Sequence, residues 1–201
     1  LDFYVYPYFN KTLVNIEFAV SRDKYYVLYN NDWESDSLWF GDQLHVDNTS
    51  GGSTNTVFAC FDSTGQCLWS RLLNAFTVNL YYGASHIAID ESTGLIYITA
   101  SGHGYDPAYP DWNYNTFDGD TLWGADINAR QGDYKLVLAC YDTLGNKQWV
   151  KYTHGPGNMN CIGMNLLPGR KLAMGGNTYG GDAILDGMHT NLQNEERAAY
   201  F

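Results

Sequence analysis

Internal repetition constrains the fold of this 201-residue chain more than any other feature of its sequence. The segment 57–69 (VFACFDSTGQCLW) recurs at 137–149 (VLACYDTLGNKQW), 80 residues further on. A second segment, 87–102 (IAIDESTGLIYITASG), recurs without gaps at 162–177 (IGMNLLPGRKLAMGGN), and a weaker copy lies at 18–29 (FAVSRDKYYVLY). Because the copies alternate along the chain, we expect one supersecondary unit to be repeated several times.

Each copy has the pattern of a β-hairpin, with two runs rich in Val, Ile, Tyr and Phe around a turn rich in Asp, Ser, Thr and Gly. At 62–65, Asp62 can cap the turn and Gly65 can adopt the positive φ that such turns require. Two hairpins make a four-stranded meander, and the central repeat predicts strands at 86–90, 95–100, 136–142 and 147–152. No stretch has helical periodicity. The sequence therefore predicts an all-β protein, and repeated four-stranded sheets are typical of a β-propeller with antiparallel blades.

These hairpins resemble the seven-bladed β-propeller repeat family of secreted and cell-surface proteins. The segment 87–102 is similar to the inner hairpin of that repeat, and 57–69 is similar to its outer hairpin and to the related repeat of quinoprotein-type propellers. The matching positions are Asp62, Gly65, Trp69, Asp90, Gly94 and Tyr97, with Asp142, Gly145, Trp149 and Gly169 in the next blade. Ser21 and Asn165 depart from the pattern, because the inner strand of the family has Asp there. The resemblance implies a fold and an interaction role without catalytic residues, and we expect Trp69 and Trp149 to wedge between adjacent blades.

The repeats predict one partial propeller. We expect 1–15 to be the end of a preceding blade or an N-terminal strand, followed by blades at 16–72, 84–153 and 161–201. The last blade is incomplete, because 197–201 (RAAYF) fits the third strand of the pattern. We therefore expect a fragment of a larger propeller, and the alternative is that several subunits complete one ring.

Long insertions at 30–54, 102–134 and 177–195 separate the second and third strands of the predicted blades. They contain 14 of the 22 acidic side chains and only one base, Arg130, so they account for the net charge of −11. Because strands alternate in direction, the insertions are expected on the same face of the ring. This charge argues against nucleic acid as a partner, and no run of 18 apolar residues predicts a membrane span.

The same insertions are rich in aromatic side chains, which predicts a face that contacts a partner protein or another copy of the chain. The residues expected to form this face are Trp33, Trp39, Tyr105, Tyr109, Trp112, Tyr114 and Trp123. Two insertions share a motif, 36–44 (DSLWFGDQL) and 120–127 (DTLWGADI). One interpretation is a lid that folds back onto the blade, and the other is that the repeated aspartates bind a cation.

The candidate calcium site lies at 111–120 (DWNYNTFDGD), where oxygen-bearing side chains alternate as in the first half of a calcium loop. The candidate ligands are Asp111, Asn113, Asn115, Asp118 and Asp120. The segment has Thr116 where a calcium loop has Gly, and it has no Glu at the twelfth position. A solvated, turn-rich loop is the alternative.

The remaining candidates bear on the compartment. Cys60 and Cys67 flank one turn and predict a disulfide if they face each other, although Cys60 can instead be a small buried packing residue. Asn10 and Asn48 begin glycosylation sequons. Together these patterns predict a secreted, non-enzymatic propeller that acts in adhesion or assembly. The alternatives are a carbohydrate-binding lectin, with tryptophans stacking on sugars, and a propeller enzyme of the hydrolase or quinoprotein type.

Overall fold

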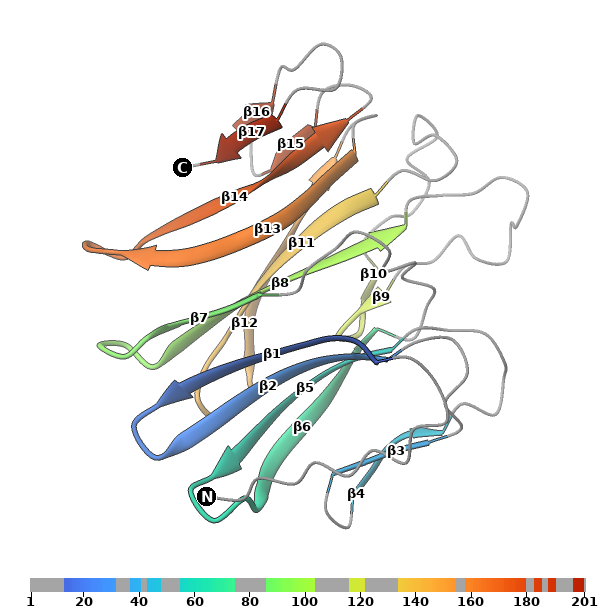
Figure 1. The fold of residues 1–201 in the computed structure, drawn as a ribbon, viewed down its shortest axis with the longest axis vertical. Coiled ribbons are helices and arrows are strands. Elements are labelled where there is room, and N and C mark those ends of the chain that lie inside the picture. The colour runs from blue at the N-terminus through green and yellow to red at the C-terminus, as the bar shows by residue number, and fades with distance from the viewer. Residues whose placement is uncertain are drawn as a thin grey trace.

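The computed structural model describes residues 13–31, 37–40, 43–47, 55–74, 86–103, 116–121, 134–154, 158–179, 183–185, 188–190 and 197–200. These residues form an all-β structure of antiparallel sheets (Figure 1). The described part of the chain contains no helix, and therefore none that is long and apolar enough to cross a membrane. The prediction of an all-β protein is confirmed.

Three main sheets follow one another along the chain. Sheet 1 has the order β1-β2-β5-β6, and sheet 2 contains β7-β8-β11-β12 in the same sequential order. Sheet 3 consists of β13-β14-β17. The strands of the three sheets are β1 (Leu13–Ser21), β2 (Lys24–Asn31), β5 (Asn55–Asp62), β6 (Cys67–Asn74), β7 (His86–Asp90), β8 (Leu95–His103), β11 (Tyr134–Tyr141), β12 (Lys147–His154), β13 (Asn158–Leu167), β14 (Lys171–Tyr179) and β17 (Arg197–Tyr200). The four strands predicted for the central repeat are therefore present.

The turns between the third and fourth strands form as the sequence predicts. The Asp62 carboxylate accepts hydrogen bonds from the backbone N–H groups of Thr64 and Gln66, at 2.8 and 3.0 Å. Asp142 makes the equivalent pair of bonds in sheet 2, both 2.9 Å long. Gly65 and Gly145 close the two turns with φ of 88° and 79°. The same local sequence therefore produces the same turn in both repeats.

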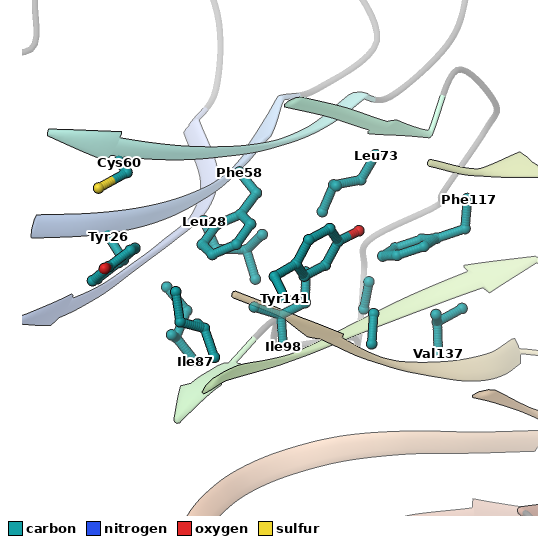
Figure 2. Close-up of a cluster of buried hydrophobic side chains, with 13 residues drawn as sticks. Tyr26, Leu28, Phe58, Cys60, Leu73, Ile87, Ile98, Phe117, Val137 and Tyr141 are labelled. Atoms are coloured by element: carbon teal, nitrogen blue, oxygen red, sulfur yellow. The ribbon is translucent and has the colours of Figure 1, made fainter. Parts of the chain in front are cut away.

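The three sheets stack face to face (Figure 1). Figure 2 shows the core between sheets 1 and 2, where Phe58 of β5 and Tyr141 of β11 meet edge to face with ring centroids 5.4 Å apart. Both rings are fully buried, and each such burial stabilises the fold by about 2–3 kcal/mol. A second core between sheets 2 and 3 contains Leu138 and Met159. The facing sides of neighbouring sheets are thus buried against each other, and a third cluster around Val27, Val57 and Phe61 is buried on the other face of sheet 1.

Trp69 and Trp149 lie at the contacts between successive sheets, as the repeat predicted. Trp69 on β6 donates a hydrogen bond from Nε1 to the Thr143 carbonyl, at 3.1 Å, and covers the turn at Gly145 in sheet 2. Its repeat counterpart, Trp149 on β12, packs against the core between sheets 2 and 3. The two outer strands that the structure describes, β6 and β12, therefore each supply an indole to the interface with the next sheet.

The inner strands of successive sheets also lie beside one another. Strand β7 contacts both β1 and β13, and Glu17 Oε1 on β1 lies 3.7 Å from His86 Nδ1 on β7. At the turn ends of these strands, Arg22 donates to the Glu91 carbonyl at 3.3 Å, and Arg170 Nε lies 3.7 Å from Asp90 Oδ2. Arginines from sheets 1 and 3 therefore reach the same turn of sheet 2.

The third repeat differs in register from the ungapped sequence alignment, which pairs Ile87 with Ile162. Ile87 is 9% exposed and belongs to the core, whereas Ile162 is 57% exposed. The turn after β13 is one residue shorter than the turn after β7, and a bulge interrupts β13 between Cys161 and Gly163. Counted from the turn, the structural counterpart of Ile87 is Met164, which packs between sheets 2 and 3.

Candidate functional site

The described parts of the insertions form short hairpins: β3 (Ser37–Phe40) with β4 (Gln43–Asp47), β9 (Thr116–Phe117) with β10 (Asp120–Thr121), and β15 (Ala183–Leu185) with β16 (Met188–Thr190). Two of these hairpins attach to the outer strand of the preceding sheet. Strand β15 pairs with β12 at Thr153, which extends sheet 2 to six strands. Strand β9 lies beside β6, and the Asp118 N–H donates to the Leu73 carbonyl.

These two attachment points are equivalent in the repeat. Leu73 and Thr153 occupy the same position of their outer strands, 80 residues apart, and each is the point where the insertion of the following repeat attaches. A hydrogen-bonded attachment also satisfies backbone groups at the sheet edge. Two of the three insertions are therefore anchored to the stack of sheets at defined points.

The hairpin β9–β10 is built around a two-residue turn. Asp118 and Gly119 both have positive φ, 46° and 84°, and Phe117 pairs directly with Asp120. Positive φ at both central residues defines a type I′ turn, for which Asp-Gly is a favoured sequence. The Asp-Gly dipeptide was the available signal for this hairpin, and the interpretation of 111–120 as a calcium loop missed it.

The side chains of this hairpin enter the junction between sheets 1 and 2. Phe117 is 3% exposed and belongs to the core that the two sheets share, as Figure 2 shows. A buried phenylalanine stabilises the position of its backbone by removing apolar surface from water. The hairpin is thus held in place by the buried Phe117 side chain as well as by the backbone hydrogen bond from Asp118 to Leu73.

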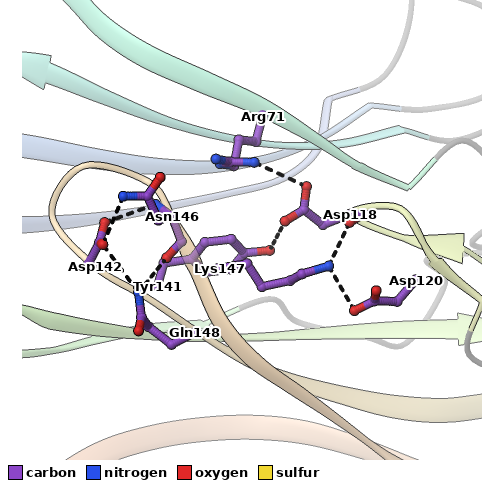
Figure 3. Close-up of polar contacts among 8 residues, drawn as sticks. All are labelled: Arg71, Asp118, Asp120, Tyr141, Asp142, Asn146, Lys147 and Gln148. Carbon is purple, nitrogen blue, oxygen red and sulfur yellow. Dashed lines mark hydrogen bonds and ion pairs between the residues drawn. The ribbon is translucent and has the colours of Figure 1, made fainter.

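Asp118 is the centre of a polar network that joins both sheets (Figure 3). Its Oδ1 atom lies 3.5 Å from Arg71 Nη1 on β6, and its Oδ2 atom accepts a hydrogen bond from the Tyr141 hydroxyl at 3.2 Å. Burial raises the pKa of Tyr141 far above its usual value, and the neighbouring Asp118 adds to the rise. Tyr141 therefore remains a neutral hydrogen-bond donor to the carboxylate.

Lys147 provides the second cation of the network. Its Nζ atom donates to the Asp118 carbonyl at 2.8 Å and to Asp120 Oδ2 at 2.7 Å. The side chains of Asp118 and Asp120 are 12% and 52% exposed, so of the two carboxylates only that of Asp118 is well shielded from solvent. The sequence interpretation did not identify Arg71, Tyr141 or Lys147 as partners, because the contacts join residues that are 23 to 47 positions apart in the chain.

Two of the five calcium candidates therefore form ion pairs within the protein. Asp118 and Asp120 are neutralised by protein cations, whereas Asp111, Asn113 and Asn115 lie outside the described residues. Within the described residues, no group of three or more His, Cys, Asp or Glu side chains is arranged to hold a metal ion.

Most residues of the predicted contact face also lie outside the described residues. Trp39 is on β3, where the backbone alone is described. The others are Trp33, Tyr105, Tyr109, Trp112, Tyr114 and Trp123. The sequon residues Asn10 and Asn48 are likewise outside the described part of the chain.

The predicted Cys60–Cys67 disulfide does not form, and both residues are free thiols. A bulge between Cys60 and Phe61 shifts the register, so Cys67 lies opposite Phe61 and Cys60 lies opposite Trp69. The two thiols consequently pack in cores on opposite faces of sheet 1. Burial raises the pKa of Cys60 to about 11, in keeping with the alternative that it is a packing residue.

No protein-family model matches the chain, and no curated protein matches its sequence.

Proposed function

We propose that this chain is an extracellular, non-enzymatic β-propeller module of the seven-bladed-repeat type, which uses its insertions for adhesion or assembly. The observation that carries the proposal is the attachment of two successive insertions at the same position of the preceding outer strand, at Leu73 and Thr153. Insertions that are anchored in this way can present side chains to a partner from a rigid frame.

The arrangement of the sheets supports a propeller. Consecutive sheets bury their faces against each other, their inner strands lie side by side, and each outer strand places a tryptophan over the next sheet. In a propeller, the inner strands gather around the central axis and the blades pack face to face. An extracellular location is supported by the family that the repeats resemble.

The charge of the insertions supports a protein partner with a basic surface. The insertions contain 14 acidic side chains and one base, and of the acidic side chains Asp118 and Asp120 are neutralised within the protein. The side chains of the other twelve lie outside the part of the chain that the structure describes, and their assignment to the contact surface rests on the sequence. Complementary charge accelerates association with a basic partner and disfavours an acidic one.

Binding of the labelled protein to cell surfaces and to immobilised extracellular proteins tests this function. We expect Trp112→Ala and Trp123→Ala to reduce binding, whereas Leu144→Ala should not. Leu144 is a suitable control because it is 70% exposed and lies on a turn between strands of sheet 2, outside the insertions. Absence of binding, or equal binding by all variants, would contradict the proposal.

A glycan array separates this function from the lectin alternative. Sugar binding that is lost in Trp112→Ala would identify the chain as a lectin. Binding to proteins without any signal on the array supports the adhesion or assembly role instead.

Calcium binding by the segment 111–120 is proposed on sequence alone, and it would require the ion to compete with Arg71 and Lys147 for Asp118 and Asp120. Calcium that binds only the folded protein raises the melting temperature. A chelator should then lower the melting temperature, and added calcium should restore it. An unchanged melting temperature would exclude a stabilising calcium site.

A further inference from the structure

The hydrogen-bond donor to Asp118 is a side chain in which the two repeats differ. Tyr141 occupies the position of Phe61, 80 residues earlier in the chain. The two positions are also equivalent in the structure, because a bulge precedes each residue and each is buried on the face of its sheet that is turned away from the following sheet. Phenylalanine therefore suffices for packing at this position of the repeat, and Tyr141 adds a hydroxyl group that reaches Asp118 at 3.2 Å.

The two cations near Asp118 also differ from their repeat counterparts. Lys147 stands where sheet 1 has Cys67, and its Nζ atom donates to the Asp118 carbonyl at 2.8 Å. Arg71 stands where sheet 2 has Lys151, and its Nη1 atom lies 3.5 Å from Asp118 Oδ1. All three differences thus provide contacts to one hairpin of the insertion. We refer to Arg71, Asp118, Tyr141 and Lys147 as the Asp118 network (Figure 3).

The Tyr141 hydroxyl favours the state in which the hairpin β9–β10 lies in the junction of sheets 1 and 2. Tyr141 is fully buried, and a buried hydroxyl without a hydrogen-bond partner destabilises the fold. Departure of the hairpin would remove the partner of this hydroxyl. Each strand of the hairpin has only two residues, too few for a two-stranded hairpin to be stable by itself. Its position therefore depends on the buried Phe117 ring, the backbone contact with Leu73 and the Asp118 network.

The hairpin lies in the middle of the insertion 102–134, between two of the tryptophans proposed to contact a partner. Trp123 follows Thr121 by two residues, and Trp112 precedes Thr116 by four residues. Chain connectivity keeps the Cα atoms of these tryptophans within about 7 Å and about 14 Å of the hairpin ends. Fixing residues 116–121 therefore limits where both tryptophans can lie.

We propose that the Asp118 network positions this insertion for binding: Arg71 and Tyr141 hold residues 116–121 in the junction of sheets 1 and 2, and the molecules with the hairpin in place are the ones that bind a partner. This inference rests on the proposed function, in which Trp112 and Trp123 contact the partner. Arg71 and Tyr141 are positioning residues, because they act through the hairpin. The apparent affinity then falls with the fraction of molecules that have the hairpin in place.

Amide hydrogen exchange of residues 116–121 tests the first half of the proposal. Tyr141→Phe removes one hydroxyl, alters no charge and restores the residue found at position 61. The Asp118 N–H, which donates to the Leu73 carbonyl, reports opening of the hairpin. We expect its exchange to accelerate about tenfold, because the variant removes a buried hydrogen bond to a carboxylate, and the strands of sheets 1 and 2 should not show an equal acceleration.

Tyr26→Phe is the matched control. Tyr26 is 1% exposed and belongs to the same core as Tyr141, but its hydroxyl interacts with Cys60. This variant should leave the exchange of residues 116–121 unchanged. Unchanged hairpin exchange in Tyr141→Phe, or an equal acceleration throughout the sheets, would overturn the proposal. An acceleration of the same size in Tyr26→Phe would overturn it too.

Binding to the immobilised extracellular proteins and cell surfaces of the assay above tests the second half. Exchange gives the fraction of molecules with the hairpin in place, and the affinity of Tyr141→Phe and Asp118→Ala should fall in proportion to that fraction. Because Tyr141 is fully buried and the Asp118 side chain is 12% exposed, such a loss does not come from a direct contact with the partner. Unaltered binding by a variant whose hairpin is open in most molecules would overturn the positioning role.

The two proposals can fail separately. Absence of binding by the wild-type protein would contradict the proposed function, whereas exchange alone decides whether the Asp118 network holds the hairpin. Binding that depends on Trp112 and Trp123 but not on the state of the hairpin would refute the positioning role and leave the proposed function intact.

Discussion

Gly145 packs directly beneath the indole of Trp69, so a substitution at this glycine measures the contact between sheets 1 and 2. A Cβ atom at Gly145 would lie 2.8 Å from Cδ2 of Trp69 and 3.0 Å from Cε2 and Cε3. These distances are shorter than van der Waals contact, and the φ of 79° is unfavourable for any residue with a side chain. Gly145→Ala should therefore destabilise the protein through two separate effects.

The backbone effect costs about 1 kcal/mol, because alanine is strained in the left-handed region. Displacement of the indole would weaken its hydrogen bond to the Thr143 carbonyl, worth about 1 kcal/mol. It would also disturb the contact with Phe58, whose ring centroid lies 5.0 Å away, at a cost of about 1 kcal/mol. The total is about 3 kcal/mol, or roughly 9 °C in melting temperature for a chain of this size.

Gly169→Ala provides the matched control. Gly169 also lies in a turn and has a positive φ, 78°, but a Cβ atom there would meet nothing within 4 Å. It should lose only the backbone contribution of about 1 kcal/mol. Urea unfolding followed by circular dichroism measures both variants. Equal losses in the two variants would refute the conclusion that Trp69 requires a glycine beneath it.

The other predictions concern the polar network, the turns and the thiols. Asp118→Ala should lower the free energy of unfolding by about 2 kcal/mol, because it leaves the buried Tyr141 phenol and the Arg71 guanidinium without their partner. Asp120→Ala should cost less than about 1 kcal/mol, because its site is exposed. Similar losses for the two variants in urea unfolding would argue against the central role of Asp118. The hydrogen bond from the Thr64 hydroxyl is the largest cause that lowers the pKa of Asp62 below 3.8. The pKa of Asp62 is lower in the folded than in the unfolded protein, so its turn stabilises the fold fully above the unfolded-state pKa and loses this contribution as the pH falls through the folded-state pKa. Asp62→Ala should therefore weaken the acid dependence of the melting temperature between about pH 5 and pH 2. An unaltered profile would contradict the turn's role. A thiol reagent at neutral pH should label the partly exposed Cys67 in the native protein before the buried Cys60, and a lower melting temperature after reduction would instead indicate a disulfide.

The local features of the fold could be predicted from the sequence. The alternation of apolar residues around Asp, Ser, Thr and Gly predicted the strands of the central repeat, and the turns at Asp62 and Asp142 formed as expected. These features depend on neighbouring residues, so a short window contains the necessary information. The repeat also predicted that Trp69 and Trp149 lie between sheets.

Errors arose where a single residue changes the register. A bulge beside Cys60 places it opposite Trp69, which excludes the predicted disulfide. A shorter turn and a bulge in β13 move Met164 into the position of Ile87. Because side chains alternate between the two faces of a strand, a shift of one residue exchanges the buried and exposed sets.

The sequence by itself determined the repeated hairpins, the all-β character and the concentration of acidic residues in the insertions. Only the tertiary structure decided which of those acidic residues have partners. Asp118 meets Arg71 and Tyr141 because the hairpin at 116–121 enters the junction of two sheets, and the partners are far away in the sequence. Charge and periodicity are properties of the chain, whereas pairing across an interface depends on the relative positions of sheets that only folding brings together.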